Sequence, residues 1–221
     1  MEQNHMKILD LYSCAGGAAM GYHRAGFDVF GVDIEPQPNY PFPHATADAV
    51  EFLLECGHEF DWIHASPPCQ AHSATAKGTN KKLGVDYIDD IPRLRPALLE
   101  VGVPYILENV AGAPIRKDLM LCGEMFGLPL LLHRYFEIHG AVVEQPVHPK
   151  HRGRVRGWRH GVYYDGPYIA AYGKGGGKAS VQEIQEAKQM PWTNVHKELT
   201  EALPVPYTEY IGNQILNGGL R

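Results

Sequence analysis

The feature that most constrains the fold is a short apolar run that ends in two prolines and a cysteine, FDWIHASPPC at residues 60–69. Residues 60–65 are apolar enough to form a buried strand. Pro67 and Pro68 then end sheet pairing, because proline lacks a backbone donor and restricts the residue before it. Cys69 follows at once. The pattern therefore predicts a thiol just past the carboxyl end of a strand, where open α/β sheets bind their ligands.

Two interpretations of Cys69 stay open from this stretch alone. A free cysteine is most often a small, buried, hydrophobic residue. However, a polar and basic run follows from Ser73 to Lys82 and includes Lys77 and Lys81. A reactive thiol beside such a run favours covalent chemistry on an anionic polymer.

Length and composition set wider limits. The chain has 221 residues, of which 44% are hydrophobic and 20% charged, and this predicts one soluble globular domain or one domain with a small insert. No apolar run approaches the ~20 residues of a membrane span, and residues 1–6 lack a signal-peptide pattern, so we expect a cytoplasmic protein. The four cysteines are scattered without a CxxC pair, which indicates neither a disulfide framework nor a zinc knuckle.

Charge is distributed unevenly along the chain. The net charge is −5, yet residues 150–178 hold seven lysines and arginines against Asp165 alone, so this window carries +6 and the remainder −11. Such segregation is typical of a surface that binds a polyanion. A solvated basic loop is the alternative.

The amino-terminal third has the pattern of a nucleotide-type site. An apolar run at residues 7–12 leads into the glycine-rich SCAGGAAMG, then a helix that Gly26 ends, then a strand at 27–32 that leads to Asp33. Glycines let a ligand approach the backbone, and the acid accepts ribose hydroxyls. GxGxxG is absent, which disfavours a nicotinamide cofactor. Ile34 is placed to pack on a purine. Asp48 either caps the next helix or accepts from an exocyclic amino group.

The rest of the chain predicts further strands and helices. Residues 86–103 read as a helix with Leu94, Leu98 and Leu99 inward, and Pro104 begins a strand that runs into Glu108 and Asn109. A carboxyl group at the end of a buried strand is costly unless it is paired or has a task. Later segments read as a short helix at 119–127, a strand at 130–138 with Arg134 in its middle, a helix at 180–189 capped by Ser180, and an apolar segment at 205–216.

The segment from 139 to 178 differs from its surroundings, because it is rich in glycine, proline, histidine, arginine and tyrosine. We expect a core at 1–138, a small basic lobe at 139–178 and a return to the core at 179–221. His148, His151 and His160 suggest a metal ligand set, but no cysteine stands near them in the sequence. Histidines that face solvent or phosphate are therefore preferred, and no metal site is expected.

Six motifs in the order DLYSCAGG, VDIEP, SPPCQ, ENV, HRYF and YIGNQI carry a resemblance across nearly the whole chain. The set resembles the DNA (cytosine-5)-methyltransferase family, and most of all its compact phage-encoded members. The pairing of PCQ after one strand with ENV on the next is its most specific part. The resemblance implies a class I S-adenosylmethionine-dependent methyltransferase, an α/β Rossmann-like fold with a mostly parallel sheet, helices on both faces and a small irregular target-recognition insert.

The resemblance also implies roles for individual residues. The cofactor S-adenosylmethionine would contact Asp10, Ala15, Gly16, Gly17, Asp33, Ile34, Asp48 and Asn213. Catalysis would fall to Cys69 as the nucleophile, Glu108 as the acid beside the base, and Arg134 at the base O2. Substrate and DNA contacts would come from Pro68, Gln70, Ser73, Lys77, Lys81, Asn109, Arg152, Arg154 and Arg156. The sequence departs from the family pattern at Cys14, where a glycine is usual, and at Leu132, where an arginine is usual.

The expected reaction is methylation of carbon 5 of a cytosine flipped out of double-stranded DNA, through a covalent adduct with Cys69. The small lobe suggests a short target sequence, since it offers few base contacts. We expect a monomer without a structural metal, of the restriction–modification or phage type, in a bacterial or phage-infected cell. Two alternatives stay open, namely a cytosine-5 methyltransferase that acts on RNA such as tRNA, and a non-catalytic DNA-binding relic. Transfer of a different group from a modified cofactor is also open.

Overall fold

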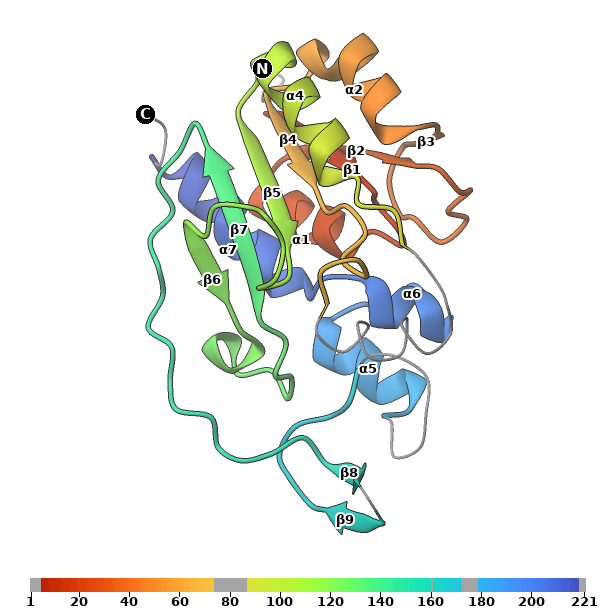
Figure 1. Ribbon diagram of the computed structural model, residues 1–221, viewed down its shortest axis with the longest axis vertical. Coiled ribbons are helices and arrows are strands. Elements are labelled where there is room, and N and C mark those ends of the chain that lie inside the picture. Colours follow the sequence, from red (N-terminus) through yellow and green to blue (C-terminus); the bar gives the residue numbers. More distant parts are fainter. Residues whose placement is uncertain (1–4, 74–86, 160, 172–178, 219–221) are drawn as a thin grey trace.

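A seven-stranded sheet forms the centre of the computed structural model, which describes residues 5–73, 87–159, 161–171 and 179–218 (Figure 1). Its strands follow the order β3-β2-β1-β4-β5-β7-β6. The first five strands in this order are parallel to one another, while β7 runs antiparallel to both β5 and β6. The strands are β1 Lys7–Leu11, β2 Asp28–Asp33, β3 His44–Thr46, β4 Trp62–Ala65, β5 Tyr105–Asn109, β6 Leu119–Leu121 and β7 Arg134–His139. The expected mostly parallel sheet is confirmed.

Helices cover both faces of this sheet, as expected. On one face lie α1 Gly17–Ala25 and α7 Val205–Leu216, and on the other α2 Ala49–Cys56 and α4 Ile91–Val101. Two more helices, α5 Val181–Lys188 and α6 His196–Glu201, lie beyond the carboxyl edge of the sheet (Figure 1). Single 3₁₀ turns occupy Gly57–Glu59 and Gly123–Phe126. Among the described residues, no helix has the length and apolar character needed to cross a bilayer.

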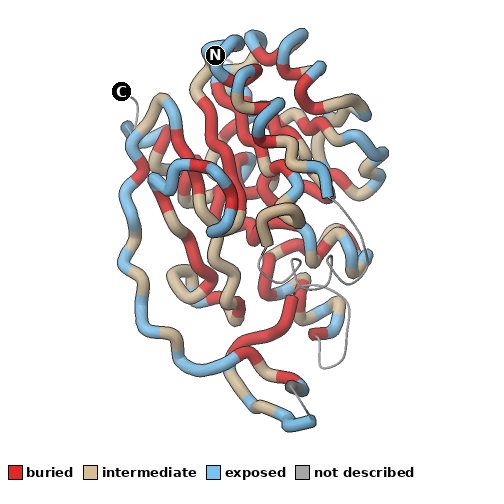
Figure 2. The backbone as a smooth tube through the Cα atoms, in the orientation of Figure 1, coloured by how far each residue is buried: buried red, intermediate tan, exposed pale blue. Residues whose placement is uncertain are grey.

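The alternation of strand side chains divides the core into two parts. On β1, Ile8 packs into the cluster beneath α1 and α7, while Leu9 and Leu11 pack into the cluster beneath α2 and α4. Alternate residues of a strand point to opposite faces, so a parallel sheet covered on both sides needs an apolar residue at nearly every position. The strands at the centre of Figure 2 are accordingly buried along their length.

Glycines set the bounds and the packing of α1. Gly16 precedes the helix with φ 80°, and Gly26 ends it with φ 113°, a left-handed conformation that favours glycine. Inside the helix, a Cβ on Gly21 would lie 2.0 Å from Thr208 Oγ1 of α7. Thr208 Oγ1 also donates to the Ala18 carbonyl at 2.8 Å. The two helices are therefore in backbone contact, and only glycine fits at position 21.

Three expectations for local structure are wrong. Helix α4 begins at Ile91, and Leu99 is 61% exposed because it follows Leu98 by about 100° around the helix, off the buried face. Residues Leu119–Leu121 form the edge strand β6 rather than a helix, because pairing with β7 satisfies their backbone. Arg134 is the first residue of β7, not the middle of a longer strand.

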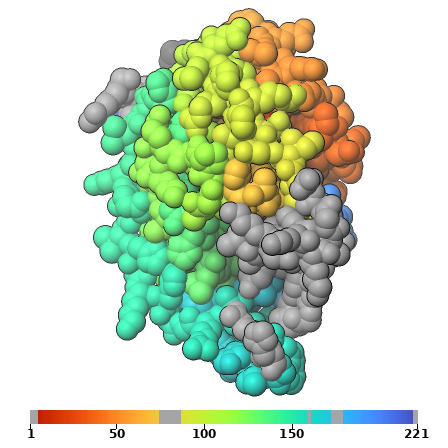
Figure 3. All heavy atoms as spheres, in the orientation of Figure 1, coloured from red at the N-terminus to blue at the C-terminus, as the bar shows by residue number. Residues whose placement is uncertain are grey.

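Within the expected basic lobe at 139–178, the described part is mostly irregular. It holds the two-stranded hairpin of β8 Gly157–Arg159 and β9 Val162–Tyr164. The division of the chain at 138 and 178 stays a prediction. On the face shown in Figure 3, α4 lies beside the connection from β5 to β6, where Arg95 Nη2 donates to the Pro114 carbonyl at 3.0 Å.

Candidate active site

The motifs meet at the carboxyl edge of the parallel strands. The glycine-rich turn follows β1 and the SPPC segment follows β4, and these two strands are neighbours although they are far apart in sequence. Connections leave β1 toward β2 and β4 toward β5, so this is the point where the strand order reverses. Ligands of open α/β sheets bind in the crevice at that point.

The segment that carries Cys69 is held against β5 from two sides. Asn109 Nδ2, at the end of β5, donates to the Pro67 carbonyl at 3.0 Å. The backbone N of His72 donates to the Cys69 carbonyl at 3.1 Å and closes a turn around the thiol. A Cβ on Gly112 would lie 2.4 Å from the His72 carbonyl oxygen, so glycine permits this approach. Cys69 is half-buried on a braced turn, as expected for a positioned nucleophile.

Glu108 and Arg134 form an ion pair beside this turn. Arg134 Nε lies 2.9 Å from Glu108 Oε1, on the paired strands β7 and β5. Its N–H does not point along the line to that oxygen, and Glu108 Oε1 accepts no directed hydrogen bond from the described residues. Burial raises the pKa of Glu108 to about 7, although the charge of Arg134 acts in the opposite direction. Glu108 is therefore able to hold a proton near neutral pH.

The thiol belongs to the same electrostatic group. Burial raises the pKa of Cys69, and the carboxyl of Glu108 raises it further, while the cation of Arg134 lowers it. These mutual effects require the three side chains to be near one another. The structure thus brings together the three residues expected to catalyse the reaction.

Asp10, at the carboxyl end of β1, faces the glycine-rich turn from inside the protein. It is fully buried, and Tyr40 Oη donates to its Oδ2 at 3.2 Å. Its Oδ1 is also buried and has no hydrogen-bond partner among the described residues. Burial raises the pKa of this carboxyl well above its usual range. A buried acceptor without a donor is an uncommon feature and indicates a ligand contact.

Asp33, at the end of β2, stands on the other side of that turn. Its Oδ2 accepts from the Cys14 backbone N at 2.9 Å, and its Oδ1 accepts from Glu35 N at 3.1 Å. Ile34 beside it is 65% exposed, which suits an apolar surface for a planar ring. Cys14 adopts φ 47°, a left-handed conformation, and this explains why a glycine would be usual at that position.

Two further expected cofactor residues are Asp48 and Asn213. The Asp48 carboxylate caps α2 by accepting from Val50 N and Glu51 N, and Arg93 Nη2 donates to it at 2.5 Å. The helix-cap interpretation of Asp48 is therefore confirmed. Asn213 is exposed on α7, next to Gly212, which packs against Ala25 at the far end of α1 from Gly16. The structure does not bring Asn213 to the glycine-rich turn.

The expected substrate residues have mixed placements. Pro68 is exposed, Gln70 has a buried Oε1 without a hydrogen-bond partner among the described residues, and Asn109 braces the Cys69 turn. Ser73 lies at the end of a described range, and Lys77 and Lys81 lie outside the described residues.

In the basic window, two of the three expected DNA-binding arginines already have partners. Arg152 Nε lies 2.8 Å from Glu124 Oε1, and Arg156 pairs with Glu183. Both carboxylates stand outside the window at 150–178, so the net positive charge of this surface is smaller than the sequence indicated. Arg154 instead lies over the ring of Tyr164, at 5.4 Å from its centroid.

Sequence reasoning missed two residues that complete the site. Lys188 of α5 is fully buried, its Nζ donates to the Ala202 carbonyl at 2.6 Å, and burial with the charge of Arg134 lowers its pKa to about 7. Trp192 Nε1 donates to the Ala15 carbonyl at 2.8 Å and braces the glycine-rich turn. Lys188 ends an ordinary amphipathic helix, so nothing in its local sequence separates it from a solvated lysine.

Comparisons with known proteins agree with this geometry. No protein-family model matches the chain. The sequence is 24% identical over 206 residues to the type II methyltransferase M.AgeI of Thalassovita gelatinovora, which covers 74% of this chain and 48% of the relative. It is 26% identical over 175 residues to M.HgiDI of Herpetosiphon aurantiacus, which covers 63% and 54%. The chain is thus similar in sequence to type II methyltransferases. It spans about half the length of these two curated relatives.

Solved structures support the same fold. The chain superimposes on the Dnmt2 methyltransferase of S. pombe with a TM-score of 0.63 at 14% identity, over 97% of this chain and 99% of that one. The Entamoeba histolytica methyltransferase EhMeth gives 0.61 at 10% identity over the same shares. Together with the sheet order, these likenesses confirm the expected class I methyltransferase fold. The methyltransferase resemblance is likewise confirmed.

Proposed function

We propose that this chain methylates carbon 5 of cytosine in double-stranded DNA, with S-adenosylmethionine as the donor and Cys69 as a covalent nucleophile. The observation that carries the proposal is the grouping of a braced thiol, Cys69, with the buried pair of Glu108 and Arg134 at the carboxyl edge of the sheet. The two curated relatives are named type II methyltransferases, which supports methyl transfer.

The residues around the glycine-rich turn fit the donor. Asp33 offers a carboxylate for ribose hydroxyls, Ile34 an exposed apolar surface for adenine, and Asp10 a buried oxygen that lacks a donor. Gly16 and Gly17 let a ligand reach the backbone, with Ala15 beside them. S-adenosylmethionine, when bound, supplies an electrophilic methyl group. Contacts of Asp48 and Asn213 with this ligand stay predictions.

The first chemical step belongs to the thiolate of Cys69. Its sulfur forms a bond to C6 of the cytosine, and the electron pair of the C5–C6 double bond moves into the ring toward N3 and O2. Glu108 holds its proton near neutral pH and donates it to N3 as charge builds there. Arg134 stabilises the negative charge at O2. The thiol has to lose its proton to solvent before it attacks. This deprotonation costs free energy, because burial disfavours the thiolate.

The second step makes and breaks the remaining bonds. C5 is now electron-rich and would bond to the methyl carbon while the bond between that carbon and the donor sulfur breaks, so the proton at C5 then has to leave. Removal of that proton to water restores the C5–C6 double bond, expels the sulfur of Cys69 and returns the N3 proton to Glu108. The protein ends in its starting state, with one proton released to solvent for each methyl group transferred.

The target base has to leave the duplex, since carbon 5 cannot reach a buried thiol while it is stacked, and flipping costs a few kcal/mol. Contacts of Pro68, Gln70 and Ser73 with the flipped base stay predictions, as do those of Lys77 and Lys81, which lie outside the described residues. Arg152, Arg154 and Arg156 would contact the duplex around a short target. Action as a monomer in the cytoplasm, within a restriction–modification or phage setting, stays a prediction.

Trapping tests the covalent step directly. Duplex DNA in which 5-fluorocytosine replaces cytosine keeps fluorine where a proton has to leave, so the adduct with the Cys69 sulfur should persist and migrate as a cross-linked species. Cys69→Ala should form none, and Cys56→Ala, a matched free cysteine outside the site, should form as much as the unmodified chain.

Bisulfite sequencing of DNA from cells that express the chain should show cytosines that resist conversion in one short sequence context. Cytosines in other contexts should be converted. Parallel reactions of labelled S-adenosylmethionine with duplex DNA and with tRNA show which polymer accepts the methyl group. Transfer to tRNA alone would contradict the DNA proposal. Absence of both adduct and transfer, with donor and DNA shown to bind, would favour the non-catalytic relic.

A further inference from the structure

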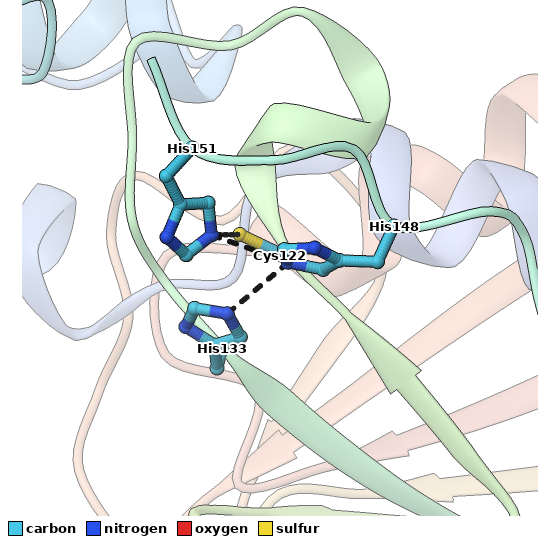
Figure 4. A group of neighbouring side chains, drawn as sticks. All are labelled: Cys122, His133, His148 and His151. Atoms are coloured by element: carbon cyan, nitrogen blue, oxygen red, sulfur yellow. Dashed lines mark hydrogen bonds between the residues drawn. The ribbon is translucent and has the colours of Figure 1, made fainter. Parts of the chain in front are cut away.

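Four side chains with metal-binding atoms converge on one point. They are Cys122, His133, His148 and His151, and the four ligand atoms, one from each side chain, all lie within 4.8 Å of one another (Figure 4). Cys122 directly follows β6 and His133 directly precedes β7. His148 and His151 belong to the basic segment after β7, which is the expected lobe at 139–178. Cys122 is buried and the histidines are half-buried.

The separations match those of a tetrahedral zinc site. His148 Nε2 lies 3.3 Å from His133 Nε2 and 3.2 Å from His151 Nε2, and Cys122 Sγ lies 3.6 Å from His151 Nε2. Around a tetrahedral Zn²⁺ with Zn–N of ~2.05 Å and Zn–S of ~2.3 Å, ligands lie ~3.3 Å apart for N···N and ~3.6 Å for N···S. The other three pairs lie within 4.8 Å and need to close by at most roughly 1.5 Å to reach these values.

Hydrogen bonding among the four groups does not account for the arrangement. A neutral imidazole nitrogen carries either one hydrogen or one lone pair. His148 Nε2 contacts the Nε2 atoms of two other rings, so one hydrogen or one lone pair has to serve both contacts. A bond that is well directed to one neighbour is therefore poorly directed to the other. A cation between the three nitrogens and the sulfur removes this conflict.

We propose that Cys122, His133, His148 and His151 bind one structural Zn²⁺ ion. Nitrogen and thiolate ligands favour zinc over calcium or magnesium, which prefer oxygen. Four protein ligands leave no open position, which is typical of a structural site and not of a catalytic one. The ion would tie the basic segment to the β6–β7 edge of the sheet.

The site would also fix a residue of the reaction centre. His133 precedes Arg134, whose Nη1 donates to the His133 carbonyl at 3.2 Å. On the other side, the Tyr168 ring lies edge-on to His151, and its hydroxyl donates to Glu124 at 2.6 Å and accepts from Arg152 N at 2.8 Å. One ion would therefore join the arginine that faces Glu108 to the segment expected to contact DNA.

Metal analysis of the purified full chain tests the site without DNA or methyl donor, so its failure is distinct from failure of the methyltransferase proposal. We expect ~1 zinc per chain, removal by a strong chelator with a lower Tm, and recovery of Tm when Zn²⁺ is returned. Cys122→Ala and His148→Ala should each lose most of the bound zinc. Cys56→Ala and His58→Ala, a cysteine and an exposed histidine outside the cluster, should retain it.

Cobalt keeps the test decisive where a ligand variant fails to fold. Co²⁺ added to the unmodified, metal-free chain should give the intense visible bands of tetrahedral cobalt and a thiolate charge-transfer band, both saturating at ~1 equivalent. Zinc should then displace the bands. Zinc below ~0.1 per chain together with cobalt spectra that lack the thiolate band would overturn the proposal.

Discussion

Glu108 shows how one buried carboxyl sets the pH dependence of the proposed reaction. Its pKa is raised to about 7 by burial, and burial also raises the pKa of Cys69. The active form needs Glu108 protonated and Cys69 ionised. Because the acid has the lower pKa, kcat/KM should rise with pH up to about 7, stay level, and fall only above the pKa of the thiol.

Glu108→Gln should change the shape of that profile. A glutamine keeps a donor for N3 but cannot transfer a proton, so we expect kcat/KM to fall by about 10²–10⁴-fold. Between pH 7 and 9 the rate of the variant should keep rising as the thiol ionises, while the unmodified chain stays level. Steady-state rates on a fixed duplex check this. An unchanged plateau in the variant would remove Glu108 from the proton step.

Lys188 should make the free energy of unfolding depend on pH. Its folded pKa is lowered to about 7, so between pH 7 and 10.5 the unfolded chain binds a proton that the folded chain does not. Stability from this group therefore rises with pH in that window, by up to about 1.4 kcal/mol per pH unit. Denaturant unfolding of the unmodified chain and of Lys188→Met should show the rise only in the former. Parallel curves would contradict the prediction.

At the scale of elements, the contact between α1 and α7 depends on one missing side chain. A methyl group on Gly21 would meet Thr208 Oγ1 and the Val205 carbonyl, which lie 2.0 and 2.4 Å from its Cβ. Gly21→Ala should therefore force the helices apart and lower the free energy of unfolding by roughly 1–3 kcal/mol. Leu54→Ala, at a position 45% exposed on α2, is the helical control and should change it far less. Denaturant melts give both values.

At the scale of the whole molecule, the charge that the window at 150–178 can offer to DNA depends on which of its arginines pair with carboxylates from other segments. Arg152 and Arg156 each face a carboxylate, Glu124 and Glu183, whereas within the described ranges no carboxylate pairs with Arg154. Arg154→Ala should weaken DNA binding and reduce the slope of log K against log salt by about 0.9. Arg156→Ala should change that slope less, since it leaves Glu183 unpaired as well. Binding titrations at several salt concentrations check the contrast.

Much of the architecture follows from local pattern. The strand before Pro67, the helix that Gly26 ends and the acid at Asp33 each depend on neighbours a few residues away, so their placement was predicted and is confirmed. The prediction that Leu99 points inward was wrong, because Leu98 and Leu99 are adjacent and cannot both lie at the centre of the buried face of the helix. Residues 119–121 failed because β pairing with a distant strand outweighs helical propensity in a short apolar run.

The sequence by itself predicted that Cys69, Glu108 and the nucleotide-type turn lie close together, because each stands at or just past the end of a parallel strand, and such ends meet at one edge. Arg134 reaches Glu108 differently, because it begins the antiparallel strand β7. Only the tertiary structure decided which distant side chains join them. Lys188 enters the site from a helix beyond that edge, and Cys122 meets His148 and His151 across the β6–β7 border, although no cysteine is near those histidines in sequence. Such meetings depend on how separate elements pack, and no local pattern encodes that packing.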